Sequence, residues 1–312
     1  MAPIISVIIP SWNTASYLQA TLQSVAAQTF REFEVIMVDD ASTDETYSIM
    51  QGWVGRDTRF HTIRFPENRG VVAARNAAMN LAKGEYVAML DGDDLWVSDA
   101  LSCRYKAAMR FPKAAVIATD FSWFENLVPP DPVGRVNLGL QAREVFAEAY
   151  RNEQPVYFEN PFNVVATLHF AWTGATLVRR DKMTEVGNFD PNFFGPEDTL
   201  LWLKLANRAP FVFIPVVTAH YRQRAGSLVH LQREPKEFHY LKVLQYIVRN
   251  SDFAARRISL NRIMSMCYDD CATNFRKQEK WRLARKHAIH GVNIDPFTWK
   301  HWRNIFAALL KR

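Results

Sequence analysis

The stretch Gly84-Glu-Tyr-Val-Ala-Met-Leu-Asp-Gly-Asp-Asp94 contains a short apolar run that leads directly into three carboxylates. The run, residues 86–90, lies between a glycine and an acidic turn, which is typical of a central strand in a parallel sheet. Open α/β sheets bind ligands beyond the carboxyl ends of their strands. Asp91 and Asp93 could therefore hold a divalent cation, since Mg²⁺ typically takes one or two carboxylates and leaves its other positions to phosphates. A solvated turn or a helix cap is the alternative interpretation.

Strands and helices alternate on both sides of this stretch. The apolar periodicity predicts strands at 4–9, 34–38, 59–65 and 115–119, and helices at 16–28, 71–83 and 98–110. Three local signals accompany them: a capping box at Ser42–Glu45 that opens a further helix, Ser98 as an N-cap, and Gly84 at a helix C′ position. The alternation predicts an α/β fold with a mostly parallel sheet, flanking helices and right-handed crossovers.

The composition is that of an ordinary globular protein. The 312 residues are 48% hydrophobic and 22% charged, which allows a sizeable core, and no apolar run approaches the ~20 residues that a spanning helix needs. A strand-like segment follows Met1 at once, so no signal peptide is expected. The cysteines, Cys103, Cys267 and Cys271, are odd in number and lack the spacing of a metal site. We therefore expect a reduced, cytoplasmic protein.

Polar residues follow two further predicted strands. The first strand ends at Pro10-Ser-Trp12-Asn, and the second ends at Asp39-Asp40. Strand ends on one edge of a parallel sheet converge, so these residues should lie near the acidic turn. Trp12 could stack on a nucleotide base and Asp40 could accept from a base N–H; a core-edge tryptophan and a carboxylate at a helix start are the alternatives. Neither a dinucleotide fingerprint nor a P-loop is present.

The second half of the chain offers another set of titratable residues. Residues 121–165 are irregular and predict an insertion over the binding edge, and residues 169–179 predict a strand. Glu197 and Asp198 open a helix, where the helix dipole alone favours acids, although one of them could act as a general base. His220 follows another strand, 211–217, and is either a metal ligand or a structural histidine.

The net charge of +6 is concentrated near the C-terminus. Residues 276–312 contain ten lysines and arginines against two acids, whereas residues 1–275 are close to neutral. This distribution argues against a nucleic-acid groove across the main domain. The last segment, 297–312, carries one apolar stripe made of Trp302, Ile305, Phe306, Leu309 and Leu310. The stripe is typical either of an interfacial helix on an anionic membrane or of a helix packed on its own domain.

Several of these segments occur in the order typical of one enzyme family. They are Ser6–Asn13, Val38–Glu45, Asn68–Asn76, Gly84–Asp93, Thr173–Gly174, Gly187–Asp190, Glu197–Asp198 and Tyr221–Ser227. In these segments the chain resembles family 2 glycosyltransferases, the inverting class with a GT-A fold, a Rossmann-like sheet flanked by helices. The resemblance implies a catalytic domain at 1–228 and leaves 229–312 as a helical C-terminal extension, basic and amphipathic at its end.

The resemblance implies a donor site at the sheet edge. Pro10, Trp12 and Asp40 would hold the base and ribose of a nucleotide sugar, most often a UDP-sugar. Arg75 would lie near the diphosphate.

The resemblance also implies the catalytic groups. Asp91 and Asp93 would form a DXD motif for Mn²⁺ or Mg²⁺, with Asp93 the more direct ligand and His220 a further candidate. Asp198 would be the catalytic base, and Glu197 would lie near the hydroxyls of the acceptor or the sugar.

The function expected on these grounds is that of a hexosyltransferase. A metal-assisted single displacement, with Asp198 as base, would move a sugar to a hydroxyl of a saccharide or lipid-linked acceptor during synthesis of a cell-envelope or surface polysaccharide. The protein would be cytoplasmic, with peripheral contact at the inner face of the plasma membrane through its C-terminal helix as the further expectation. A metal-dependent nucleotidyltransferase and a non-catalytic sugar-nucleotide-binding protein stay open as alternatives, and no nucleic-acid partner is expected.

Overall fold

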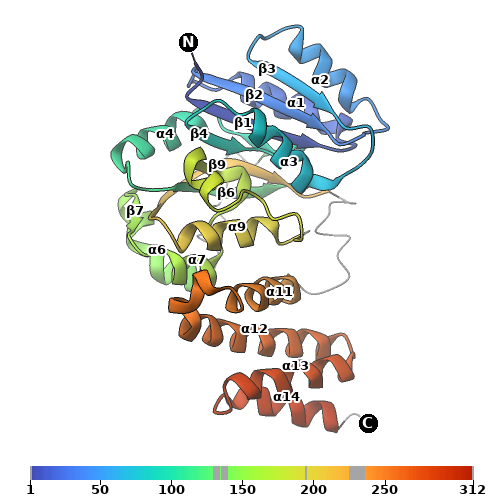
Figure 1. Ribbon diagram of the computed structural model, residues 1–312, viewed down its shortest axis with the longest axis vertical. Helices are drawn as coiled ribbons and strands as arrows, with labels where there is room; N and C mark the ends of the chain where they lie inside the picture. The colour runs from blue at the N-terminus through green and yellow to red at the C-terminus, as the bar shows by residue number, and fades with distance from the viewer. Residues whose placement is uncertain (1, 129–133, 135–139, 194, 225–235, 311–312) are drawn as a thin grey trace. The chain divides into compact units, whose positions relative to one another are not determined.

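Figure 1 shows the computed structural model, which describes residues 2–128, 134, 140–193, 195–224 and 236–310. The chain divides into two compact units, residues 1–225 and residues 226–312. We call them the N-terminal unit and the C-terminal unit. The domain boundary expected at residue 228 lies outside the described residues.

The N-terminal unit is a mixed sheet with helices packed on it. The strands follow the order β3-β2-β1-β4-β8-β6-β9-β5, and β7 pairs with β9. They are β1 (Ile5–Ser11), β2 (Phe33–Asp39), β3 (Phe60–Arg64), β4 (Tyr86–Met89), β5 (Leu95–Trp96), β6 (Val116–Phe124), β7 (Val156–Phe158), β8 (Thr176–Arg179) and β9 (Phe211–Arg222). The first four strands in this order are parallel, β8 is antiparallel to both of its neighbours, and β6 is parallel to β9.

The helices of this unit connect successive strands (Figure 1). They are α1 (Ala15–Ala26), α2 (Thr46–Val54), α3 (Gly70–Leu81), α4 (Ala100–Arg110), α6 (Leu140–Asn152), α7 (Phe162–Leu168), α8 (Arg180–Glu185) and α9 (Glu197–Ala206), with the short 3₁₀ helix η1 (Thr173–Ala175). The α/β class expected from the alternating periodicity is thus confirmed.

Apolar periodicity accounts for how these elements pack. All seven residues of β1 are buried, because the strand lies between two others and under helices. On α1, Leu18, Leu22 and Val25 recur at helical spacing and are fully buried. Each of these side chains contributes about 1.5–3 kcal/mol by leaving water. The centre of the sheet is therefore a rigid base for the residues at its edge.

Glycine 84 has a different role from the one expected. Helix α3 ends at Leu81, and its C-cap, Ala82, is extended, so Gly84 is not a helix C′ residue. A Cβ atom at Gly84 would lie 2.6 Å from the backbone nitrogen of Ser6. The glycine is needed because β1 and the segment leading into β4 approach each other at backbone distance.

The expected capping box at Ser42–Glu45 is also wrong. Helix α2 starts at Thr46, and Ser42 instead accepts a hydrogen bond from the backbone N–H of Asn13 at 2.9 Å. Asp44 accepts from the backbone N–H groups of Thr46 and Ala15, both at 3.0 Å. These residues therefore tie the loop after β2 to the loop after β1, a long-range task that a local motif does not reveal.

Two further local expectations change. The N-cap of α4 is Asp99 rather than Ser98. Of the strand expected at 169–179, only residues 176–179 form β8, since His169 adopts a left-handed conformation with φ 47° and residues 173–175 form η1.

The C-terminal unit is helical. Its helices are α11 (Lys236–Val248), the 3₁₀ helix η2 (Ser251–Arg256), α12 (Arg257–Lys277), α13 (Trp281–Ile294) and α14 (Trp299–Leu309). Helices α12, α13 and α14 pack on one another around apolar residues such as Leu260, Cys271 and Ala288. Within the described chain, no helix combines the length and the apolar character that crossing a membrane requires.

Candidate active site

Three strand ends converge at one edge of the sheet, as expected. Ser11 at the end of β1 is in register with Asp39 at the end of β2, and the N–H of Leu90 donates to the carbonyl of Ile8 at 3.0 Å. The acidic turn that follows Leu90 therefore lies beside the end of β1. A Cβ atom at Gly92 would overlap Ser11 Oγ, so the turn requires a glycine at this close approach.

Arginine 75 joins the acidic turn to the start of α9. Its guanidinium, on α3, is 2.8 Å from Asp91 Oδ1 and 2.8 Å from Glu197 Oε1. Only 4% of the side chain is exposed, and the guanidinium lies 5.2 Å from the ring centroid of Phe189. Burial opposes the charged form, but the two carboxylates outweigh it and raise the pKa of Arg75. This residue is therefore a permanent cation at the centre of the site.

The end of β9 holds the acidic turn from the other side. Arg224 Nε donates to Asp93 Oδ2 at 2.6 Å, and the backbone N–H of Arg222 donates to Asp94 Oδ1 at 2.7 Å. The Arg222 side chain also donates to the carbonyl of Asp93 at 2.8 Å and lies 4.3 Å from the ring centroid of Phe124. These contacts with the turn join residues that lie 128–131 positions apart in the chain, so no local sequence pattern revealed them.

Burial raises the proton affinity of several carboxylates in this cluster. It raises the pKa of Asp93 and, further, that of Asp94, and neighbouring aspartates add to both shifts. Burial raises the pKa of Glu197 to about 7 although Arg75 lowers it, and the pKa of Asp198 is raised for the same reason. These carboxylates therefore hold a proton more readily than exposed carboxylates do.

Asp198 lies next to Glu197 in the first turn of α9. Its Oδ1 accepts from the N–H of Thr199 at 2.6 Å and from the Thr199 hydroxyl at 3.3 Å. These local hydrogen bonds fix the orientation of the carboxylate. The structure therefore brings Arg75, Asp91, Asp93, Glu197 and Asp198 into one group.

The residues expected to bind the nucleotide lie at the same edge. Pro10 is buried in β1, and Trp12 directly after the strand is half exposed. Both carboxylate oxygens of Asp40 accept backbone hydrogen bonds, from Arg69 at 2.7 Å and from Gly70 at 2.8 Å. Asp40 therefore caps the N-terminus of α3, and any role in binding a base stays a prediction.

His220 has structural partners. It pairs in register with Leu95 of β5, its Nδ1 lies 2.7 Å from Ser122 Oγ, and its ring meets that of Phe124 edge-on. Burial lowers its pKa, so it is neutral near pH 7. Within the described residues, no three histidine, cysteine, aspartate or glutamate side chains are grouped to hold a metal, and nothing in these contacts favours His220 as a ligand.

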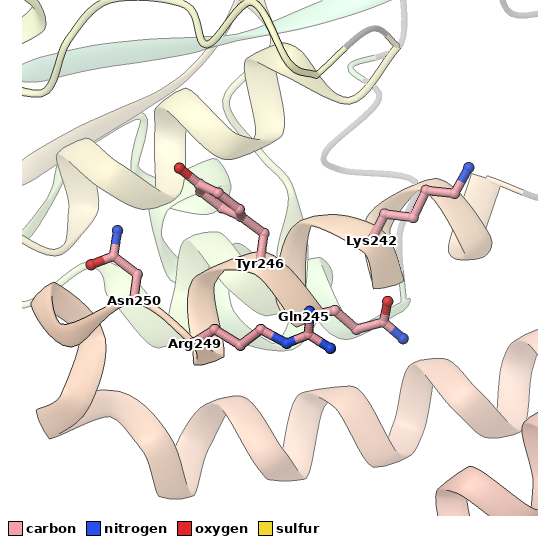
Figure 2. Close-up of a pocket in the computed structure, with 5 residues that line it drawn as sticks. All are labelled: Lys242, Gln245, Tyr246, Arg249 and Asn250. Atoms are coloured by element: carbon pink, nitrogen blue, oxygen red, sulfur yellow. The ribbon is translucent and has the colours of Figure 1, made fainter.

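A separate hollow of about 350 Å³ lies in the C-terminal unit. Lys242, Gln245, Tyr246, Arg249 and Asn250 line it, from α11 and the turn after it (Figure 2). Its lining contains no carboxylate and none of the residues expected to act in catalysis. The sheet edge is therefore the candidate active site.

Comparison with known sequences gives one consistent result. The family described as Glycosyl transferase family 2 matches residues 6–187. An Escherichia coli protein, UDP-Glc:alpha-D-GlcNAc-diphosphoundecaprenol beta-1,3-glucosyltransferase WfaP, is 38% identical over 226 residues, which cover 72% of this chain and 79% of that protein. TuaG of Bacillus subtilis, named for teichuronic acid biosynthesis, is 46% identical over 99 residues, which cover 32% of this chain and 39% of that protein.

Solved structures with the same fold include two that contain a bound nucleotide sugar. Residues 1–349 of Staphylococcus aureus TarS, in complex with UDP-GlcNAc, align with a TM-score of 0.71 and 18% identity over 99% of this chain and 89% of that one. The mannosyltransferase PcManGT from Pyrobaculum calidifontis, in complex with GDP-Man and Mn²⁺, aligns with a TM-score of 0.60 and 20% identity over 100% of this chain and 87% of that one. At these identities the likeness establishes the fold alone.

Proposed function

Because the chain belongs to glycosyl transferase family 2 and has the GT-A fold, we propose that this glycosyltransferase moves a hexosyl group from a UDP-sugar to a saccharide or lipid-linked acceptor during synthesis of a cell-envelope polysaccharide. The observation that carries the proposal is the Arg75 bridge, which joins Asp91 to Glu197. The carboxylates proposed to act on the donor and on the acceptor thereby lie in one cluster, of which Glu197 is buried and Asp91 is half-buried. The names of the E. coli and B. subtilis relatives support the choice of donor and pathway.

The proposed chemistry is a single displacement with inversion. Asp198 takes the proton of an acceptor hydroxyl, and its raised pKa makes it a stronger base than an exposed aspartate. Glu197, held by Arg75 and by the N–H of Gly195 at 3.0 Å, orients the hydroxyls of the sugar or acceptor. Because Arg75 fixes Glu197 and Thr199 fixes Asp198, these two carboxylates would meet the acceptor in a preset geometry, which favours the reaction through proximity.

The chemistry of the cluster fits a divalent cation. Among the described side chains, five carboxylates (Asp91, Asp93, Asp94, Glu197 and Asp198) face three guanidinium groups (Arg75, Arg222 and Arg224), so the carboxylates outnumber the cations that could neutralise them. Asp91 and Asp93 each pair with an arginine through one oxygen in the contacts given above, and oxygen ligands suit Mg²⁺ and Mn²⁺. When bound there, the cation would offset the charge that develops on the leaving diphosphate.

The protein is proposed to act in the cytoplasm, with a lipid-linked acceptor presented at the inner face of the membrane. The expected nucleotide contacts of Pro10, Trp12, Asp40 and Arg75 belong to this proposal, with Trp12 offering a half-exposed ring for stacking on the base.

A donor screen tests the proposed function. The purified protein is incubated with individual UDP-, GDP- and dTDP-sugars and Mn²⁺, and nucleoside diphosphate release is measured. We expect release with one UDP-sugar and none with the others. Production of pyrophosphate would assign a nucleotidyltransferase instead, and donor binding without any turnover would assign a sugar-nucleotide-binding protein.

A further inference from the structure

Helix α14 buries the side that is opposite to most of its apolar stripe. The side chains that it buries are His301, Asn304 and Ala308, two of them polar. Of the five apolar residues of the expected stripe, Ile305 is half-buried and the other four are exposed: Trp302 by 39%, Phe306 by 52%, Leu309 by 39% and Leu310 by 86%.

Specific contacts hold the polar side of α14 inward. His301 Nε2 lies 2.8 Å from Ser265 Oγ, and Asn304 Nδ2 donates to Asp269 Oδ1 at 2.7 Å, both on α12. A Cβ atom at Gly291 would overlap the ring of His301, so α13 offers a glycine where the histidine must fit. Buried polar groups with partners specify one orientation of a helix, because turning the helix would leave them unsatisfied.

The outward side of α14 is a continuous apolar stripe. At 100° per residue, Trp299, Trp302 and Phe306 lie on one face with Leu309 and Leu310, opposite the buried face. Phe297, just before the helix, is 96% exposed. Scattered exposed apolar residues are ordinary, but a stripe of this kind along a whole helix marks an interaction surface.

The charges around this stripe favour an anionic partner. Lys300 and Arg303 are exposed on α14 beside the stripe, and residues 276–312 hold ten cationic side chains against two acids. Tryptophan is enriched at membrane–water interfaces, where one part of its ring is apolar and the other wet. A basic helix with such a face typically lies in the plane of the headgroups.

We propose that the outward face of α14 docks the protein on a bilayer that contains anionic phospholipids. The apolar stripe enters the headgroup region while Lys300 and Arg303 contact lipid phosphates. Docking would bring the enzyme to a lipid-linked acceptor, and this part of the inference rests on the proposed function. The docking itself requires no catalysis.

Co-sedimentation with vesicles tests the proposal. The full-length protein should bind vesicles of phosphatidylglycerol and phosphatidylcholine, and bind pure phosphatidylcholine vesicles much more weakly. The triple variant W299Q/W302Q/F306Q should lose at least roughly tenfold in partitioning, because it removes most of the apolar face. The double variant K300Q/R303Q should lose roughly fivefold per cation on the anionic vesicles only.

A matched control distinguishes binding through this surface from nonspecific binding of the protein to vesicles. Ile258 is 88% exposed on α12, so I258Q should bind vesicles like the unchanged protein. Donor turnover, measured without lipid, should be the same in all these variants, so a failed donor screen would not affect the docking result. Equal vesicle binding by the triple variant would overturn the proposal. So would a dimer in lipid-free ultracentrifugation that the triple variant dissociates, since a second copy of the chain would then cover the stripe.

Discussion

At the scale of single residues, the carboxylates of the site differ in whether they have an arginine partner. Arg75 pairs with Asp91 and Glu197 at once, whereas Asp198, among the described residues, has local hydrogen bonds to Thr199 and no ion pair. Asp198 can therefore change its protonation state without breaking an ion pair of its own. This independence distinguishes it from Glu197, which is fixed by Arg75.

Replacing Asp198 by Asn should abolish turnover while leaving the donor bound. The amide keeps the size of the side chain but accepts no proton, and a positioned general base contributes about 10²–10⁴-fold to rate. Steady-state release of nucleoside diphosphate and calorimetric donor binding measure the two effects. Asp181→Asn is the control, because Asp181 belongs to a surface pair with Arg179. Turnover near the unchanged rate would remove Asp198 as the base.

Arg224 and a divalent cation compete for the same carboxylate. Its Nε lies 2.6 Å from Asp93 Oδ2, and the Asp93 side chain is 17% exposed. A metal that binds Asp93 must therefore displace this pair or share the carboxylate with it. The arginine acts as a built-in counter-ion of the acidic turn.

Replacing Arg224 by Gln should strengthen the binding of Mn²⁺ in the absence of nucleotide. About tenfold is expected, since a hydrogen bond to a charged group contributes about 1.5–3 kcal/mol. Titration calorimetry with MnCl₂ measures it. Arg59→Gln is the matched control, because the Arg59–Asp57 pair has a similar geometry, 2.7 Å, and Arg59 has the same side-chain exposure, 24%. Unchanged Mn²⁺ affinity in the Arg224 variant would show that the two cations do not compete.

At the scale of elements, close backbone approach positions the acidic turn. Gly84 lets the segment before β4 lie against β1, and Gly92 lets the turn after β4 lie against Ser11. Strand β4 is therefore held to β1 at both ends. A side chain at Gly84 would meet the backbone of β1, whereas one at Gly92 would meet the side chains of Ser11 and Thr14.

Gly84→Ala should destabilise the N-terminal unit. The new Cβ would lie 2.6 Å from Ser6 N and 2.8 Å from Ile5 C, and since these are backbone atoms the strands themselves must shift. Overpacking of this kind costs about 1–3 kcal/mol. Gly52→Ala is the control with the opposite expected sign. A Cβ atom at Gly52, in α2, would have no atom of the described residues within 4 Å beyond its two chain neighbours and the backbone of its own helix. Alanine should therefore stabilise this helix by about 0.8–1.0 kcal/mol. Urea unfolding midpoints measure both; equal midpoints would contradict the close approach.

At the scale of the molecule, the two units differ in how acid affects them. The N-terminal unit keeps its acids near arginines, whereas the C-terminal unit buries His287 among Phe238, Phe275 and Tyr268. Both ring nitrogens of His287 lack a hydrogen-bond partner. Burial lowers the pKa of His287 to about 4.

The C-terminal unit should therefore lose stability between pH 7 and pH 5. The folded pKa of His287 is about 4, below the ordinary value of 6.5, so in this window the unfolded chain binds more protons and stability falls as the pH falls. The loss is up to about 2 kcal/mol at pH 5. Hydrogen–deuterium exchange in peptides from α12 and α13 measures it, after correction for the intrinsic exchange rate. His287→Phe should reduce the dependence; an unchanged dependence would assign it to other groups.

The sequence by itself determined strands β1 to β4 and the helices between them, and it predicted the edge of the sheet at which the candidate site lies. The spacing of apolar residues and the residue types of turns are local properties, so β1, β2, β4 and the acidic turn could be predicted. Parallel pairing then places the ends of these strands at one edge of the sheet. The donor chemistry stays a proposal, which rests on the family and on the residues at those strand ends. Local signals failed where a residue had a distant partner. Ser42 accepts a hydrogen bond from Asn13 instead of capping a helix, and Gly84 lies against the backbone of Ser6 instead of ending a helix.

Only the tertiary structure decided which charges and which faces meet. The Arg75–Glu197 pair spans 122 residues and the Arg224–Asp93 pair spans 131, and β8 inserts antiparallel between β4 and β6. Periodicity shows which side of α14 is apolar, yet the polar side is buried because Ser265 and Asp269 supply partners for His301 and Asn304. Such choices depend on the free energy of contacts between distant segments, which no local pattern contains.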